Sequence, residues 1–244
     1  MRKVPPPPPS DKIDYFAVAR HREAGILAPT LKTFLSILGL LLIGGAALGP
    51  AHAQEADSKV QAIVEKAIAD FDKDKYDEAL KKLDEANQLK PNTPFILNLI
   101  GAAYTKKKDF TKAKEVFDQA LAVEYSFFPA QFNLGEIFFL QKQYASALDH
   151  FSRMLRNYPD NELLQFKVAL CLLLTDHLDD AKKLADRMKF PGQEPAWYYT
   201  RAAIAMKEGN KGKAKKDIAA ANTLYSGKTS LYTETFEDLD WPSK

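Results

Sequence analysis

The sequence predicts an all-helical fold built from a repeated pair of helices, and three observations support this prediction. Alanines recur at intervals of 34, 34, 34 and 33 residues, at Ala79, Ala113, Ala147, Ala181 and Ala214. Another small residue stands twelve positions before each of them, and these are Ala67, Gly101, Gly135, Ala169 and Ala202. The apolar residues around them follow helical spacing. A fixed period of about 20 to 50 residues is typical of repeat architectures, so we expect one helix–turn–helix unit per period.

Each predicted unit needs its neighbours. Two small residues twelve positions apart let a pair of antiparallel helices approach closely where they cross. One such pair cannot bury its whole apolar surface, but stacked pairs form a continuous core through contacts between neighbours. We therefore expect a single short solenoid rather than a set of independent domains.

The second and third units carry the fullest pattern, with Leu97, Ile100, Gly101, Tyr104, Ala113, Phe117 and Ala120 in one and Leu134, Gly135, Phe138, Ala147, Phe151 and Pro159 in the other. This pattern resembles the tetratricopeptide repeat (TPR) family. The resemblance implies a right-handed α-solenoid of about five units plus a C-terminal capping helix. The units are expected at about 60–93, 94–127, 128–161, 162–194 and 195–226, within a solenoid over 54–226, and the cap or tail at 227–244. The first and last units depart from the pattern, at Lys66 and Asp70 and at Arg201 and Ala205. Such departures are expected in terminal repeats, because one of their faces has no neighbouring repeat.

The first 53 residues differ in composition from the rest. Residues 1–33 form a basic leader in which Pro5–Pro9 favours extended polyproline II geometry. Residues 34–53 contain an uncharged apolar run, followed by small residues at Ala51 and Ala53. This order is typical of a signal peptide, with cleavage between Ala53 and Gln54. We therefore expect an exported bacterial protein that is periplasmic or secreted.

Two alternatives remain open for the N-terminal segment. It could stay uncleaved as an inner-membrane anchor with the repeats in the periplasm, although fifteen apolar residues span only roughly 22 Å of a ~30 Å hydrocarbon core. The true start codon could also lie after the proline tract. Whether the segment is cleaved or stays as an anchor, the repeats lie outside the cytoplasm.

Charge and composition exclude several classes of protein. The 244 residues carry a formal net charge of +2, with 34 basic and 32 acidic side chains. This near balance provides no field for nucleic acid, so we expect no nucleic-acid partner, and a membrane contact only through an uncleaved N-terminal segment. The single cysteine excludes an intramolecular disulfide. The oligomeric state is not predicted.

The residues give little support for catalysis. His150 and His177 lack partners at metal-ligand spacing, and phosphate-binding glycine loops are absent. Cys171 lies in an apolar helical run, where a buried thiol behaves as a small hydrophobic group. We therefore expect no catalytic, cofactor or metal site, and keep a thiol-dependent enzyme using Cys171 and His177 only as a weak alternative.

The resemblance also implies a binding surface. In TPR proteins the first helix of each unit lines the concave side, where a partner segment docks. The residues expected there are Phe95, Asn98, Phe132, Glu136, Phe139, Phe166, Leu170, Leu173 and Tyr199. Their apolar character favours an amphipathic helix of a protein or peptide partner. Some of them could instead pack between units, and the segment from Leu231 to Trp241 could cap the stack or occupy the groove. The chain is predicted to be a non-enzymatic adaptor of the bacterial envelope.

Overall fold

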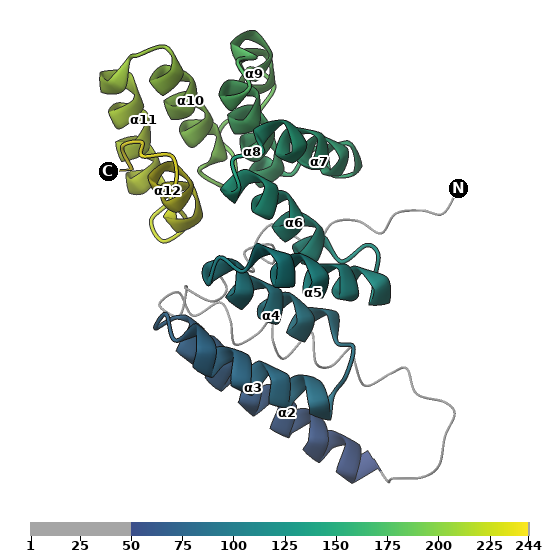
Figure 1. Ribbon diagram of the computed structural model, residues 1–244. Coiled ribbons are helices and arrows are strands. Elements are labelled where there is room, and N and C mark those ends of the chain that lie inside the picture. The colour runs from purple at the N-terminus through teal and green to yellow at the C-terminus, as the bar shows by residue number, and fades with distance from the viewer. Residues whose placement is uncertain (1–49, 244) are drawn as a thin grey trace. The chain divides into compact units, whose positions relative to one another are not determined.

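The computed structural model describes residues 50–243, and within that range the regular elements are all α-helices (Figure 1). They form consecutive pairs: α2 (Pro50–Phe71) and α3 (Tyr76–Leu89), α4 (Pro94–Lys106) and α5 (Phe110–Val123), α6 (Phe128–Leu140) and α7 (Tyr144–Asn157), α8 (Glu162–Leu174) and α9 (Leu178–Ala185), and α10 (Ala196–Lys207) and α11 (Lys211–Leu224). A short helix, α12 (Ser230–Glu237), follows the last pair. The predicted all-helical repeat fold is confirmed.

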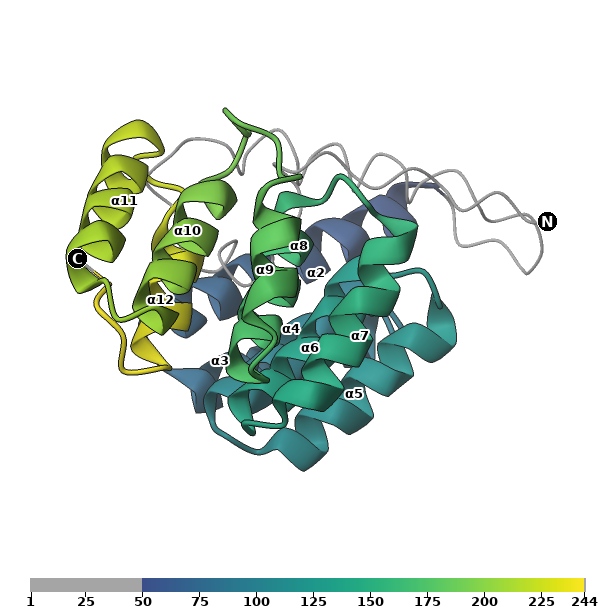
Figure 2. The same ribbon diagram turned by 90° about the horizontal axis from the view of Figure 1, so that it is seen from above.

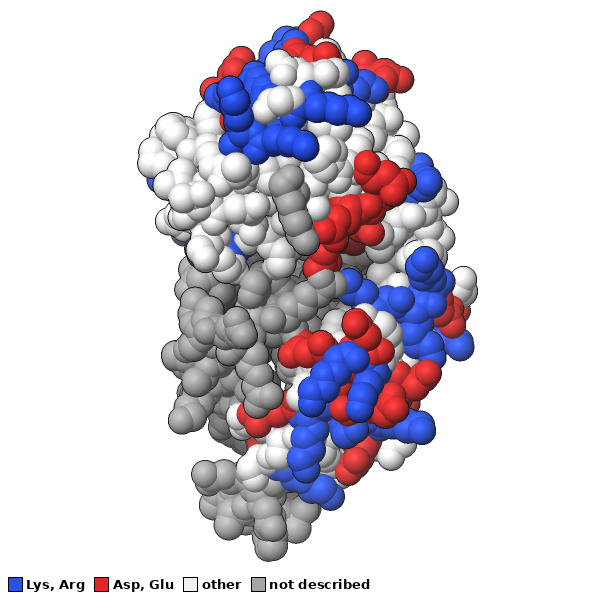
Figure 3. All heavy atoms as spheres, turned by 90° about the vertical axis from the view of Figure 1, so that its left-hand side faces the viewer, with Lys and Arg blue, Asp and Glu red and all other residues white. Residues whose placement is uncertain are grey.

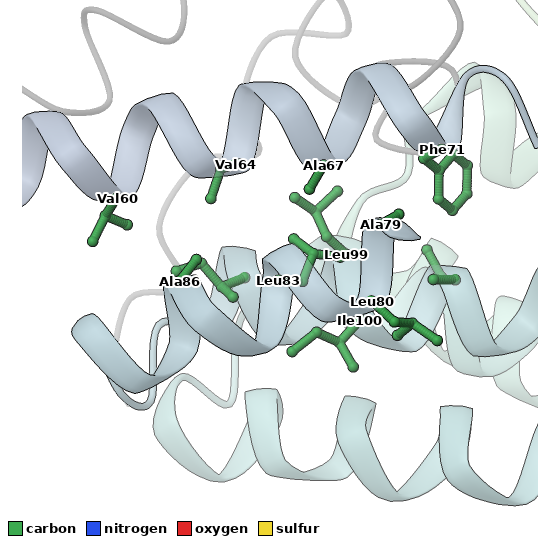
Figure 4. Close-up of a cluster of buried hydrophobic side chains, with 13 residues drawn as sticks. Val60, Val64, Ala67, Phe71, Ala79, Leu80, Leu83, Ala86, Leu99 and Ile100 are labelled. Atoms are coloured by element: carbon green, nitrogen blue, oxygen red, sulfur yellow. The ribbon is translucent and has the colours of Figure 1, made fainter. Parts of the chain in front are cut away.

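The described chain divides into two compact units, residues 50–133 and 134–243, and passes from one to the other within α6. In the first unit, α2 lies along α3, and α3 contacts α4. Figure 4 shows the core of this unit, where α2 directs Val60, Val64, Ala67 and Phe71 toward α3. Leu99 and Ile100 of α4 belong to the same buried cluster.

In the second unit α8 is the central helix. It packs against α7, α9 and α10, and Figure 2 shows it among them. Contacts on several sides require an apolar surface around most of the helix, which explains the sequence ELLQFKVALCLLL. Leu164, Phe166, Leu170, Cys171 and Leu173 are all fully buried.

The small residues of the repeat lie where the two helices of a pair cross. A Cβ atom built on Gly101 would lie 2.4 Å from Cε1 of Phe117, and one built on Gly135 would lie 2.4 Å from Cε1 of Phe151. The partner alanines Ala113 and Ala147 are fully buried. The sequence spacing therefore reflects the close approach of paired helices.

A second periodic feature is the turn inside each pair. One residue of each turn has a positive φ of 58° to 76°, and these residues are Asp74, Lys108, Lys142, Asp176 and Gly209. After α4, for example, the amide of Asp109 donates to the carbonyl of Tyr104, and that of Lys108 donates to Thr105. This is the Schellman arrangement, which satisfies the last carbonyls of the first helix while the chain reverses.

The fourth helix pair, α8 and α9, differs from the others in its second helix. Helix α9 has 8 residues, whereas the second helix of every other pair has 14. The loop from α9 to α10 is held by the carboxylate of Glu162, which accepts hydrogen bonds from the amides of Gln193 (2.8 Å) and Glu194 (3.1 Å). The missing residue of the period thus coincides with a shortened helix and a longer, anchored loop.

The N-terminal predictions fall at or beyond the edge of the described residues. The leader and the apolar run lie outside residues 50–243, while Ala51, Ala53 and Gln54 lie in the first turns of α2. The predicted cleavage would therefore remove only the first four residues of that helix. Among the described helices, none is long and apolar enough to cross a membrane.

The close crossing at Gly135 predicts that adding a single methyl group there destabilises the fold. We expect Gly135→Ala to lower the free energy of unfolding by about 1 to 3 kcal/mol, because the new Cβ overlaps the fully buried ring of Phe151. Urea denaturation of the full chain, followed by circular dichroism, measures this loss.

Gly212→Ala is the matched control, because the same change in α11 has Asn210 Oδ1 at 3.8 Å as its nearest neighbour. This variant should gain up to about 1 kcal/mol from helix propensity. Equal effects of the two substitutions would contradict the close crossing.

Candidate protein-binding face

The residues predicted to bind a partner divide between the two compact units. In residues 50–133, Phe95 is half-buried and packs against the core cluster, and Phe132 stacks on Phe128 with 6.1 Å between ring centroids. Asn98 is fully buried and accepts a hydrogen bond of 2.9 Å from Nδ2 of Asn133. In this unit the predicted residues are therefore part of buried packing.

The remaining predicted residues lie in residues 134–243 and are buried as well. Leu170 and Leu173 are fully buried, and Phe139 contacts the ring of Tyr144 at 5.4 Å between centroids. The sequence predicted an exposed apolar stripe here. The structure differs, because these side chains are buried, and a segment of the same chain contacts part of this surface.

That segment is α12, which lies beside α10 in Figures 1 and 2 and contacts α8 and α10 through aromatic rings. Phe166 of α8 lies 4.9 Å from Tyr232 and 6.4 Å from Phe236, between ring centroids. Tyr199 of α10 lies 5.2 Å from Tyr232 and 5.3 Å from Phe236. We call the surface formed by Phe166, Lys167 and Tyr199 the α8–α10 face. Helices α8 and α10 were both predicted to bind a partner, and α12 covers the face that they form.

A hydrogen bond orients this contact further. The hydroxyl groups of Tyr199 and Thr233 are 3.0 Å apart, and the Tyr199 hydroxyl also donates to Oδ1 of Asn222 at 3.3 Å. Burial raises the pKa of Tyr199 above its usual value, since a phenolate would be poorly solvated there. Tyr199 therefore remains a neutral hydroxyl when α12 is docked.

The α8–α10 face also holds a buried charge. The ammonium of Lys167 is 2.8 Å from Oε2 of Glu136, donates to Oγ1 of Thr235 at 3.0 Å, and lies 4.9 Å from the centroid of the Phe139 ring. Lys167 is fully buried, and Glu136 and Thr235 are 8% and 3% exposed. Buried charges are found with partners because an unpaired one is costly. Helix α12 thus supplies one of the oxygens that the ammonium contacts.

Sequence reasoning placed Glu136, Phe139, Phe166 and Tyr199 among the partner-binding residues but did not identify Lys167 and Thr235 as a pair. One signal was present, since Lys167 is the only charged residue after Glu162 in a largely apolar helix. The partner lies 68 positions away. Nothing in the local pattern connects Thr235 with α8.

Figure 3 shows small groups of Lys and Arg next to groups of Asp and Glu on the visible face. Lys107 pairs with Asp77, and Lys207 pairs with Asp176 at 2.6 Å. These local pairs agree with the balanced composition.

The cysteine and histidine of the alternative enzyme hypothesis have different surroundings. Cys171 is fully buried, and desolvation raises the pKa of its thiol to about 12. His177 is exposed at the start of α9, with Nδ1 3.1 Å from Oγ1 of Thr175. The described residues contain no cluster of His, Cys, Asp and Glu suited to a metal ion. This environment does not support a thiol nucleophile.

The thiol of Cys171 should therefore react slowly in the folded protein. At pH 8 a pKa near 12 leaves roughly a thousandfold less thiolate than a free cysteine has, and burial slows access further. Labelling with 5,5′-dithiobis(2-nitrobenzoic acid), with and without urea, measures the difference. Equal rates in the two conditions would show that the thiol is accessible.

Comparisons with known proteins agree with this architecture. Two models described as tetratricopeptide repeat match residues 98–162 and 138–210. The fold is similar to TTC0263, a thermophilic TPR protein of Thermus thermophilus (TM-score 0.59, 17% identity, covering 74% of this chain and 98% of that one). It is also similar to MamA from Desulfovibrio magneticus (TM-score 0.53, 18% identity, covering 75% of this chain and 100% of that one). A TPR protein of Parabacteroides merdae is similar as well (TM-score 0.53, 13% identity, covering 75% of this chain and 74% of that one). Residues 98–210 thus match the tetratricopeptide repeat family, and the chain shares the fold of solved tetratricopeptide repeat proteins.

Proposed function

We propose that the protein is a non-enzymatic scaffold that binds an amphipathic helix of another protein on its α8–α10 face. The observation that carries this proposal is the docking of α12. A helix with aromatic side chains at Tyr232 and Phe236 already buries them there, to 3% and 0% exposure. The face is therefore suited in shape and chemistry to a helix.

The exposed side of α12 supports the same mode of binding. Glu237 at the end of α12 is exposed, as are Asp238 and Asp240 just after the helix, while Tyr232, Thr235 and Phe236 are buried. Apolar anchors about one turn apart on one side of a helix are typical of helix-in-groove recognition. Because α8 and α10 already pack against neighbouring helices, the main cost of binding on the scaffold side would be the displacement of α12.

We further propose that the scaffold acts outside the cytoplasm, as an exported protein of the bacterial envelope. The N-terminal order of basic leader, apolar run and small residues before Gln54 supports export. An uncleaved inner-membrane anchor would leave the repeats on the same side of the membrane. N-terminal sequencing of the protein recovered from cells distinguishes these forms.

Binding can be tested with the full chain and a peptide. In Tyr232→Ala/Phe236→Ala, the protein's own α12 loses its two anchors, so the face should become available. A fluorescent peptide of residues 228–243 should then bind at least about tenfold more tightly than it binds the unmodified chain, where α12 competes. Fluorescence anisotropy measures both affinities.

Leu224→Ala is the matched control, since Leu224 is a 64% exposed apolar side chain on α11. This variant should bind the peptide as weakly as the unmodified chain. Circular dichroism checks that each variant keeps its helices. Absence of peptide binding by a folded Tyr232→Ala/Phe236→Ala protein would refute the proposed role of the face.

A further inference from the structure

The buried ammonium of Lys167 gives the α8–α10 face a chemical preference that apolar packing alone does not explain. The closest described contacts of Nζ are the carboxylate of Glu136 (2.8 Å), the hydroxyl of Thr235 (3.0 Å) and the face of the Phe139 ring. Two of these come from the scaffold, and the hydroxyl comes from the docked helix. The occupant of the face therefore completes the surroundings of a buried charge.

A hydroxyl group suits this position for a specific reason. Oγ1 of Thr235 donates its proton to the carbonyl oxygen of Leu231, 2.8 Å away in the preceding turn, and accepts from Lys167. The helix itself thus satisfies the hydroxyl proton and leaves a lone pair for the ammonium. A valine would leave Lys167 short of an acceptor, and a glutamate would place a second acid beside a lysine already paired with Glu136.

On the basis of the proposed function, we propose that Lys167 and Glu136 make the face selective for a partner helix that carries Ser or Thr directly before an aromatic anchor. The pattern is aromatic, two intervening residues, Ser or Thr, aromatic, as in Tyr232, Thr235 and Phe236. The hydroxyl is recognised by the buried ammonium. The aromatic residues are recognised by Phe166 and Tyr199.

The contacts of the connecting segment favour a separate protein over a second copy of this chain. The hydroxyl of Tyr225 donates to the carbonyl of Gly192 at 3.1 Å, and Nζ of Lys228 donates to the carbonyl of Gln193 at 3.2 Å and lies 3.4 Å from Oε1 of Glu194. The segment before α12 is thus attached to its own α9–α10 loop. An exchanged α12 would have to break these contacts to reach the second copy, whereas a separate helix displaces α12 alone and can leave them in place.

The selectivity is tested on the full-length Tyr232→Ala/Phe236→Ala protein with variants of the 228–243 peptide. Thr235→Ser should bind within about threefold of the parent peptide. Thr235→Val, which is nearly identical in shape, should bind about ten- to a hundredfold more weakly, and so should Thr235→Glu. Glu237→Gln is the control peptide, because Glu237 is exposed, and should bind like the parent.

A second arm changes the scaffold. In the same protein with Lys167→Met and Glu136→Gln, the penalty should disappear, so the parent and Thr235→Val peptides should bind within about threefold of each other. Hydrogen exchange in the otherwise unmodified full chain gives an independent readout. The amides of α12 should exchange about tenfold faster in Thr235→Val than in Thr235→Ser.

The outcomes separate the two proposals. Tight binding of the parent and Thr235→Val peptides alike would overturn the selectivity and leave the helix-binding role intact. Failure of every peptide, including the parent, would overturn both. Concentration-dependent dimerisation of the unmodified chain that Phe236→Ala abolishes would assign the face to α12 of a second copy, and overturn the assignment to a separate partner.

Discussion

The structure depends on how closely the two helices of each pair can approach. At the crossings of α4 with α5 and of α6 with α7, a glycine faces the ring of a buried phenylalanine with no room for a Cβ atom. Because protein interiors are close-packed, this distance cannot relax without disturbing neighbouring contacts. The turn within each pair, with one residue at positive φ, reverses the chain over the short distance that the crossing requires. The period of the sequence is the result of both constraints.

The first helix of each pair also has a surface that the crossing does not use, and on α8 and α10 this surface contacts α12. Aromatic rings provide most of the area, and aromatic pairs favour offset and edge contacts of the kind seen with α12. Lys167 adds a requirement of a different type. Apolar packing accepts many side chains, whereas a buried ammonium distinguishes an oxygen acceptor from a methyl group of the same size. In the proposed binding mode, affinity and selectivity therefore come from different residues of one face.

Much of the fold could be predicted from the sequence, because the repeat places small residues at a fixed interval and the helices follow from local spacing. The candidate site could be predicted only in part. Phe166 and Tyr199 were found from their register, but their burial by α12 depends on contacts between residues 33 to 70 positions apart. Thr235 was missed because a threonine inside a short helix has no distinctive pattern. In the sequence, the shortening of α9 was visible only as one missing residue of the period. The loop that follows α9 is held by the carboxylate of Glu162, which lies about thirty residues earlier in α8, so no local pattern predicts it.

The few residues that join α11 to α12 have a quantitative consequence. A short tether keeps a ligand at an effective concentration in the millimolar range, so under the proposed function α12 would compete with a partner helix as a local inhibitor. If α12 is docked for about 99% of the time, the apparent affinity of a partner falls about a hundredfold below its intrinsic value. Weak, non-cognate helices present at low concentration would then be excluded without any direct repulsion. In the proposed binding mode, the tether would set the concentration or affinity that a partner helix needs to replace α12 on the face.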